Sequence, residues 1–316
     1  MFDILSITGV IFVLMGTGFL SVRLGVFSSA DMAALGKFVV NLALPALILR
    51  AVSSRPLGEI ANFGYLGAVL FGSLAVFSLG YFWSRRVEGQ TALASTFGAM
   101  GMSCANSGFV GYPVLVMALP DVATTALALN MIIENLIMIP LVLVMAEHSC
   151  GEGKVTEGRL VRQIALRLVR NPIVIALLLG LAISAFGLGL PVLVERPIDI
   201  FASASAAVSL TVIGGTLAAL PLKALNVSVL SVVVGKLLLH PMAVGLGLLI
   251  MSIVGLGVGN ERLAAAAVVI AATPVMAIYP ILAQRYGEER SASMAMLVMS
   301  ALSFITISAV LLLTSR

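Results

Sequence analysis

The sequence predicts an all-α polytopic membrane protein of ten transmembrane helices, arranged as two inverted five-helix repeats with broken fourth and ninth helices. Three observations lead to this prediction: the apolar composition, ten apolar segments of membrane-spanning length, and one long polar stretch that divides them into two halves. Hydrophobic residues make up 60% of the chain and charged residues 10%, against roughly 45–50% and about 25% in soluble domains. A bilayer solvates so large an apolar surface, whereas water does not.

The charges and cysteines argue against other classes of protein. The net charge of +4 is spread over short clusters between long apolar runs, which does not indicate a nucleic-acid partner. Cys104 lies in an apolar segment and Cys150 in a polar loop, so we expect no disulfide framework. The segment from Met1 to Val22 lacks a basic start and a clear small-residue cleavage site, so we expect a retained first span and not a signal peptide.

Each predicted helix is an apolar segment close to the length of about 20 residues that crosses the hydrocarbon core. The ten segments lie near residues 4–22, 33–52, 62–83, 91–118, 122–146, 171–190, 197–220, 227–254, 262–285 and 290–314. An odd number of helices in each half forces the halves into opposite topology, which predicts an inverted repeat. The repeats occupy residues 1–148 and 171–316, and a linker occupies residues 149–170.

The loops indicate how the chain is oriented. If the N-terminus lies outside, most Lys and Arg residues of the loops fall on the inner side. The positive-inside rule then predicts a multi-pass protein of the inner (plasma) membrane, with both termini outside and the 147–170 linker cytoplasmic. In this linker, arginines and apolar residues alternate at helical spacing, which predicts an amphipathic helix on the inner leaflet. The alternative is a plain basic linker.

The fourth and ninth segments contain residues that interrupt helices. The fourth holds SCANSGFVGYPVL and the ninth AATPVMAIYP, and Tyr112-Pro113 recurs as Tyr279-Pro280 after 167 residues. Proline lacks an N–H and clashes with the preceding turn. A straight helix from Thr91 to Pro120 would be about 45 Å long, longer than the hydrocarbon core of about 30 Å. We therefore expect two broken helices that cross near the midplane; the alternative is two independently kinked helices.

Such a crossing predicts an anion site, because helix N-termini carry partial positive charge. The Asn106 amide can donate to a carboxylate or bond freed backbone groups, and Thr273 lies at the matching offset. For Asn41, lining the cavity and satisfying backbone groups are equally compatible with the sequence. The predicted substrate-binding residues are Asn106, Ser107, Gly108, Tyr112, Pro113, Thr273, Pro274 and Asn41.

Ionisable residues also occur deep in the predicted spans. Glu134 and Lys236 lie roughly 14–18 Å along their helices, near the membrane centre. They either form a structural pair or serve as a proton-titrating group and an anion counter-charge. Asn130 and His240 lie one turn away from them, and His240 is more typical of a packed histidine than of a proton relay. The candidate coupling residues are therefore Glu134, Lys236, Asn130 and His240, for H⁺ or Na⁺ coupling or for uniport; no cofactor or metal centre is expected.

Six motifs, in their order and spacing, carry a resemblance to a known family. They are NLALPAL, SCANSGFVGYPVL, RNPIVIALLLGL, SLTVIGGTLA, GKLLLHP and ATPVMAIYP. Together they resemble the auxin efflux carrier family, which includes plant PIN-formed carriers and bacterial malonate-type permeases. The likeness covers nearly the whole chain, and the short central loop resembles the bacterial members.

This resemblance implies a fold similar to that of bile-acid/sodium symporters, with elevator-type movement. Helices 3–5 and 8–10 would form a crossover (transport) domain, and helices 1, 2, 6 and 7 a scaffold through which a homodimer is expected. Asn106 and Pro113 match the family's first crossover helix, and Pro274 matches the second. Lys236 and His240 match a family segment whose role is less defined, and Glu134 has no clear counterpart.

The sequence therefore predicts a secondary transporter for small organic anions, either malonate-like dicarboxylates or auxin-like monocarboxylates. The alternatives are a sodium-coupled symporter of larger, bile-acid-type anions, a channel, and an intramembrane enzyme. An enzyme is disfavoured because GMSC lacks the second Gly of a GxSxG elbow and no paired intramembrane aspartates occur.

Overall fold

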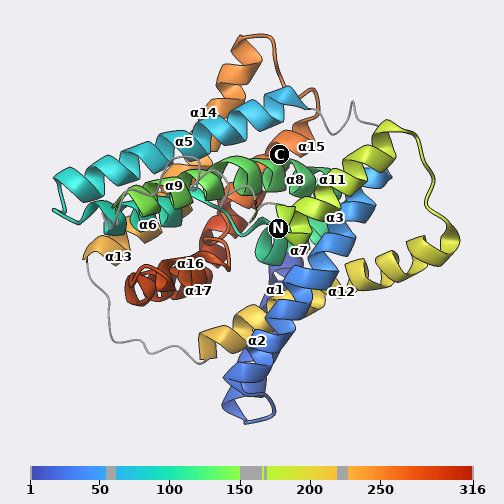
Figure 1. The fold of residues 1–316 in the computed structure, drawn as a ribbon, viewed down its shortest axis with the longest axis horizontal. Helices are drawn as coiled ribbons and strands as arrows, with labels where there is room; N and C mark the ends of the chain where they lie inside the picture. Colours follow the sequence, from blue (N-terminus) through green and yellow to red (C-terminus); the bar gives the residue numbers. More distant parts are fainter. Residues whose placement is uncertain (1, 55–61, 150–165, 167–168, 219–226, 315–316) are drawn as a thin grey trace.

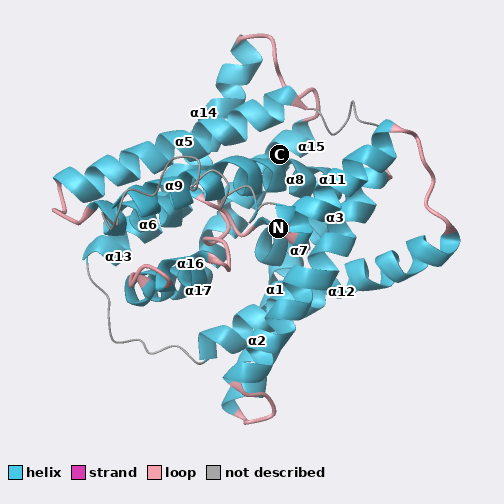
Figure 2. Cartoon of the chain, viewed as in Figure 1, coloured by secondary structure: helices cyan, strands magenta, loops and turns pink. Residues whose placement is uncertain are grey.

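The structure is a computed structural model that describes residues 2–54, 62–149, 166, 169–218 and 227–314. Every regular element in these residues is a helix (Figure 2). Most of the linker, including the predicted amphipathic face and Cys150, lies outside the described residues.

The helical elements follow one another along the chain, with η marking a π-helical turn. They are α1 (Phe2–Arg23), α2 (Ser29–Phe38), η1 (Val39–Ala43), α3 (Leu44–Ser53), α5 (Phe63–Arg86), α6 (Ala92–Ser103), η2 (Ser107–Gly111), α7 (Tyr112–Ala118), α8 (Pro120–Ile133), η3 (Glu134–Met138), α9 (Ile139–Ser149), α11 (Pro172–Ala185), α12 (Val192–Ala218), α13 (Val227–Val234), η4 (Gly235–Leu239), α14 (His240–Ile253), α15 (Glu261–Ala271), α16 (Tyr279–Gln284) and α17 (Glu289–Thr314).

In the described part of the chain, six helices are long and apolar enough to cross a membrane. They are Ser29–Ser53, Phe63–Arg86, Pro120–Ser149, Val192–Ala218, Val227–Ile253 and Glu289–Thr314. Shorter apolar helices occur at Gly9–Arg23 and Pro172–Ala185. These helices confirm the prediction of a multi-pass, all-helical membrane protein.

Two predicted boundaries were wrong, each for a local reason. The segment predicted at 171–190 ends as a helix at Ala185, because Gly187 adopts a φ of 61° and Leu188 N–H bonds back to Ile183 O. The segment predicted to begin at 197 begins at Val192 instead. Its first turns carry charged residues that lower the hydropathy without ending the helix, and one of them, Asp199, pairs with Arg50 at 3.4 Å.

Four π-helical turns occur in the described part of the chain, each ending two residues before a proline. The prolines that follow η1 to η4 are Pro45, Pro113, Pro140 and Pro241. Because proline has no N–H, the carbonyl four residues earlier loses its usual donor, and the helix widens locally. Polar side chains lie in all four turns, namely Asn41 in η1, Ser107 in η2, Glu134 in η3 and Lys236 in η4.

Helices that are far apart in the sequence pack together: α1 packs on α12, α11 lies alongside α3, and α5 lies along α14 (Figure 1). The α5–α14 contact is close enough to require glycine. A Cβ on Gly72 would lie 2.7 Å from the backbone N of Val244, and one on Gly247 would lie 2.5 Å from the carbonyl O of Ala68. This backbone contact joins the two predicted halves of the chain directly.

Candidate functional site

The helix predicted at 91–118 is broken. Helix α6 ends at Ser103, and Cys104 has an extended backbone with φ −100° and ψ 132°. Asn106 then begins η2, where its side-chain Oδ1 accepts a hydrogen bond from Phe109 N–H at 3.2 Å. The amide of Asn106 thus caps the new helix start, as asparagine does well at such positions. Pro113, in the first turn of α7, fits the same arrangement.

The helix predicted at 262–285 is broken in the matching place. Helix α15 ends at Ala271, and helix α16 begins only at Tyr279. Within the break, the Thr273 hydroxyl donates to Ile270 O at 2.7 Å, and the Thr306 hydroxyl of α17 donates to Ala272 O at 3.1 Å. Both hydroxyls donate to carbonyls at the end of α15, where regular helical donors run out.

The two breaks touch each other, and we call residues 104–106 and 272–274 the crossing. The Asn106 backbone N–H donates to Pro274 O at 2.9 Å and lies 3.1 Å from Thr273 Oγ1. Asn106 is 3% exposed and Thr273 is fully buried. Backbone from two distant parts of the chain is therefore joined in the interior.

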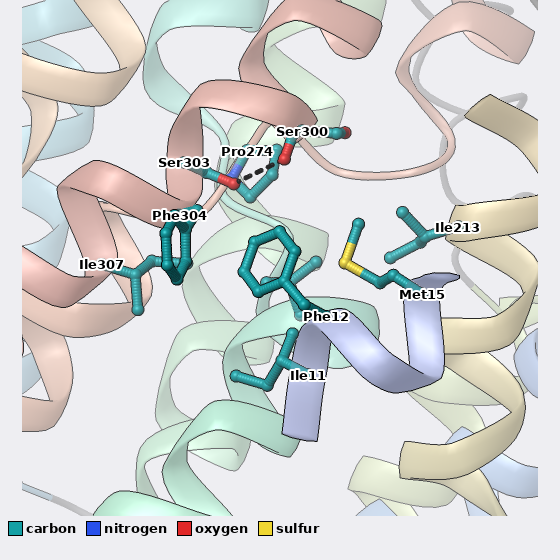
Figure 3. A pocket seen from close by; sticks show the side chains of 10 residues that line it. Ile11, Phe12, Met15, Ile213, Pro274, Ser300, Ser303, Phe304 and Ile307 are labelled. Atoms are coloured by element: carbon teal, nitrogen blue, oxygen red, sulfur yellow. Dashed lines mark hydrogen bonds between the residues drawn. The ribbon is translucent and has the colours of Figure 1, made fainter. Parts of the chain in front are cut away.

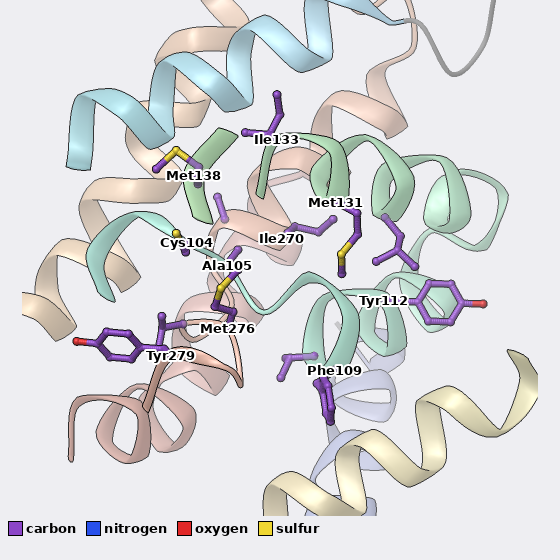
Figure 4. Packing of buried hydrophobic residues seen from close by; sticks show 14 of the residues in the cluster. Cys104, Ala105, Phe109, Tyr112, Met131, Ile133, Met138, Ile270, Met276 and Tyr279 are labelled. Carbon is purple, nitrogen blue, oxygen red and sulfur yellow. The ribbon is translucent and has the colours of Figure 1, made fainter. Parts of the chain in front are cut away.

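Seven of the eight predicted substrate-binding residues are buried at the crossing or in the helix starts that follow it: Asn106, Ser107, Gly108, Tyr112, Pro113, Thr273 and Pro274. Asn41 is the exception, because it is exposed and donates to Lys37 O in its own helix at 2.7 Å. The tyrosines Tyr112 and Tyr279 extend from the helix starts in opposite directions (Figure 4).

Asn106 retains one unused donor. Its Oδ1 is fixed by the bond from Phe109 N–H, which sets the orientation of the amide. Among the described residues, Nδ2 of Asn106 has no hydrogen-bond partner. An amide donor that no described side chain or backbone group uses is available to a ligand acceptor.

Glu134 lies beside the first break. The Ser107 hydroxyl, at the start of η2, donates to Glu134 Oε1 at 2.6 Å, and both residues are buried. The carboxyl group therefore lies near the N-terminal end of η2, where unpaired N–H groups give partial positive charge.

Lys236 lies beside the second break. Its Nζ donates to Ala271 O, the last residue of α15, at 2.6 Å, and lies 2.8 Å from His240 Nδ1. His240 Nε2 lies 3.1 Å from the Ser73 hydroxyl of α5. The ammonium thus lies at a helix C-terminus, where carbonyl groups give partial negative charge.

Glu134 and Lys236 lie near enough to interact electrostatically but make separate hydrogen bonds. No ion pair joins these two residues, both of which are described, and each contacts a different broken helix. Asn130 is placed away from the crossing, because its amide donates to the Tyr65 hydroxyl and, at 3.0 Å, to Ala126 O. Among the residues that sequence reasoning missed, Ser73 carried a weak signal, since it precedes His240 by the repeat offset of 167 residues.

A small cavity opens beside the crossing (Figure 3). Its lining combines residues of α1, α12, α17 and both breaks, namely Ile11, Phe12, Met15, Val110, Ile213, Pro274, Ser300, Ser303, Phe304 and Ile307. The rings of Phe12 and Phe304 meet edge to face across it, with centroids 4.2 Å apart. Both serine hydroxyls donate within α17, to Met296 O and Ser300 O. None of these described lining residues carries a charge. Any charged group that acts on a ligand in the cavity therefore lies behind the residues of its wall.

A second, more polar cavity lies between the α5–α6 loop, α13 and α17. Glu88 and Glu288 line it, together with the buried Tyr279 at the start of α16. Partial burial raises the pKa of the Glu288 carboxyl above its ordinary value. This cavity reaches the second broken helix from a side away from α1 and α12.

Comparison with known proteins agrees with these features. A family described as membrane transport protein matches residues 8–311. The chain is similar to a protein of Rhizobium meliloti (strain 1021) named "Putative malonate transporter", with 29% identity over 98% of this chain and 96% of that protein. It is also similar to an "Uncharacterized transporter" of Methanothermobacter thermautotrophicus, with 28% identity over 56% of each chain. With a family match over nearly its whole length, the chain belongs to the membrane transport protein family, the auxin efflux carrier-like family that its motifs predict.

Proposed function

We propose that the protein is a secondary transporter of small carboxylates of the malonate class, which it binds at the crossing. One observation carries the proposal: the buried Asn106 amide is held by Phe109 N–H and keeps an unused donor where two broken helices meet. A carboxylate oxygen is the acceptor that such a donor and the nearby start of η2 favour together. The similarity to a protein named as a malonate transporter supports this substrate class.

The cavity beside the crossing supports a binding place of limited size. It is mostly apolar, and Val110 and Pro274 bring one residue of η2 and one of the second break to its wall. A short dicarboxylate matches a narrow, mostly apolar space better than a large bile-acid-type anion does. Substrate specificity would then come from the shape of this cavity and from the Asn106 donor.

The proposal includes ten transmembrane helices in two inverted repeats. Helices α7 and α16 begin at Tyr112 and Tyr279, which are 167 residues apart. Two contacts also join residues at this separation, one between Asn106 and Thr273 and one between Ser73 and His240. Equivalent residues of two repeats can touch only near the axis that relates them, so both contacts support a pseudo-twofold axis through the molecule.

We further propose elevator-type movement. Helices α1, α2–α3, α11 and α12 would form the scaffold and the dimer surface, and the remaining helices would form the crossover domain. Support comes from the cavity, which lies between α1 and α12 on one side and the breaks and α17 on the other. Sliding one group past the other would separate Phe12 from Phe304 and change the side to which the cavity opens.

The proposed membrane placement follows the loop charges. The 147–170 linker would lie in the cytoplasm and both termini outside, in the plasma (inner) membrane. Glu134 remains a candidate for proton coupling, because it is a buried carboxyl group whose Ser107 partner belongs to the crossing helix.

The test is uptake of labelled mono- and dicarboxylates into proteoliposomes, with and without pH and sodium gradients. Asn106→Ala should abolish saturable uptake, because it removes both the free donor and the cap of η2. Gln284→Ala is the matched control, since this amide is exposed at the end of α16 and its side chain makes no described bond. Normal uptake by a folded Asn106→Ala protein would remove the basis of the proposal.

A further inference from the structure

We propose that the Lys236 ammonium is a resident cation at the carbonyl end of α15, so that transport uses no sodium ion at this end of the crossing. This inference rests on the proposed transport site. It concerns one property of that site, namely whether a sodium ion binds at the C-terminal end of α15. Broken helices in membrane transporters commonly use freed carbonyls to hold a coupling ion. Here the positive charge belongs to a side chain of the protein, the ammonium group of Lys236.

Burial and contact both support this role. Lys236 has 0% exposure and donates through Nζ to Ala271 O at 2.6 Å. A buried ammonium is tolerated only where acceptors and negative potential compensate for lost hydration. The C-terminus of α15 supplies both, because its last carbonyls lack helical donors.

A second set of bonds fixes the ammonium in this place. An ammonium has only donors, so His240 Nδ1, at 2.8 Å, must be the acceptor. The other ring nitrogen, Nε2, then carries the proton and donates to the Ser73 hydroxyl at 3.1 Å. His240 is therefore neutral and acts as a positioning residue between α5 and Lys236.

Three other carbonyls near this helix end also accept hydrogen bonds. Ile270 O accepts from Thr273, and Ala272 O accepts from Thr306. Val268 O accepts from Ala272 N–H at 3.0 Å. A sodium ion would need several of these oxygens at once, so Lys236 and the two hydroxyls leave it too few.

Helix packing alone does not require a lysine at this position. The residue 167 positions before Lys236 is Val69, which is buried in α5. The charge is therefore a feature of one half only. The nearest ionisable groups on the adjoining elements are Glu134, which bonds Ser107, and the buried Cys104 thiol.

The test uses thermal unfolding and proteoliposome uptake, with sodium chloride, methylammonium chloride or choline chloride at equal ionic strength. The wild-type protein should unfold and transport alike in all three salts. Lys236→Ala should lower uptake on the order of tenfold, because it leaves a buried carbonyl without its donor. Sodium or methylammonium, but not the larger choline, should raise the unfolding temperature of this variant. Lys37→Ala, at an exposed lysine of α2, is the matched control and should show no such response.

A sodium requirement of the wild-type protein, in uptake or in unfolding, would overturn the proposal even if Lys236→Ala fails to fold. A folded Lys236→Ala protein with normal uptake and no response to the small cations would overturn it as well. The unfolding measurement needs no substrate, so it separates the two proposals. Stabilisation of Lys236→Ala by small cations, with no carboxylate transported by the wild type, would support the cation role and refute the proposed function.

Discussion

Thr273→Val tests the contact that joins the two broken helices. The substitution keeps the shape of the side chain but removes a hydroxyl that contacts Asn106 N–H at 3.1 Å and donates to Ile270 O at 2.7 Å. Neither partner is left alone, since Asn106 N–H keeps Pro274 O and Ile270 O keeps Thr273 N–H. At about 0.5–1.5 kcal/mol for each net hydrogen bond, the free energy of unfolding should fall by about 1–3 kcal/mol.

The assay is equilibrium unfolding in detergent, with carboxylate uptake measured in parallel. Thr273→Ser should restore most of both properties because it restores the hydroxyl. Thr314→Val is the matched control, since its hydroxyl bonds only within the exposed end of α17. If Thr273→Val equals Thr273→Ser in stability and uptake, the contact does not hold the crossing together and this reasoning is refuted.

Three further substitutions test other parts of the structure. Gly247→Val would place a branched side chain where a Cβ already lies 2.5 Å from Ala68 O, so unfolding measurements should show a loss of about 1–3 kcal/mol, and an unchanged stability would contradict the close contact of α5 and α14. Ser107→Ala removes the 2.6 Å hydrogen bond to the buried Glu134 carboxyl group and should lower the free energy of unfolding by about 1.5–3 kcal/mol. The loss should be smaller in a Glu134→Gln background, and strictly additive effects of the two substitutions would argue against the bond. Phe12→Ala should enlarge the cavity, so competition assays should find that bulkier carboxylates inhibit uptake better than they do in the wild type, and an unchanged inhibitor profile would place the substrate elsewhere.

The helices of this protein were the most predictable part of its structure. Long apolar runs and the prolines of each break carry local signals, and the described helices overlap the predicted segments, with six of them long and apolar enough to cross a membrane. The predicted start of α12 was wrong because charged residues follow Val192 within the helix. Hydropathy indicates which residues lie in the membrane, whereas the helix continues for as long as its hydrogen bonds do.

The partners of the buried polar groups could not be predicted in the same way. Lys236 and Glu134 were visible as deep charges, but a pairing between them was as compatible with the sequence as the two separate contacts that the structure has. Tertiary packing decides between these arrangements. It brings Ala271 to Lys236 and Ser73 to its neighbour His240, and it brings Ser107 to Glu134. The residues that line the cavity could not be predicted either, because they are of the apolar types that occur throughout membrane helices.

The most direct measurement of carboxylate binding at the crossing is calorimetric titration of malonate into wild-type protein and Asn106→Asp. This substitution keeps the oxygen that caps Phe109 N–H but replaces the free donor with a second carboxyl oxygen. Binding should weaken by at least about tenfold while the unfolding temperature stays near that of the wild type. An Asn106→Asp protein that binds malonate as tightly as the wild type would contradict a substrate site at this amide.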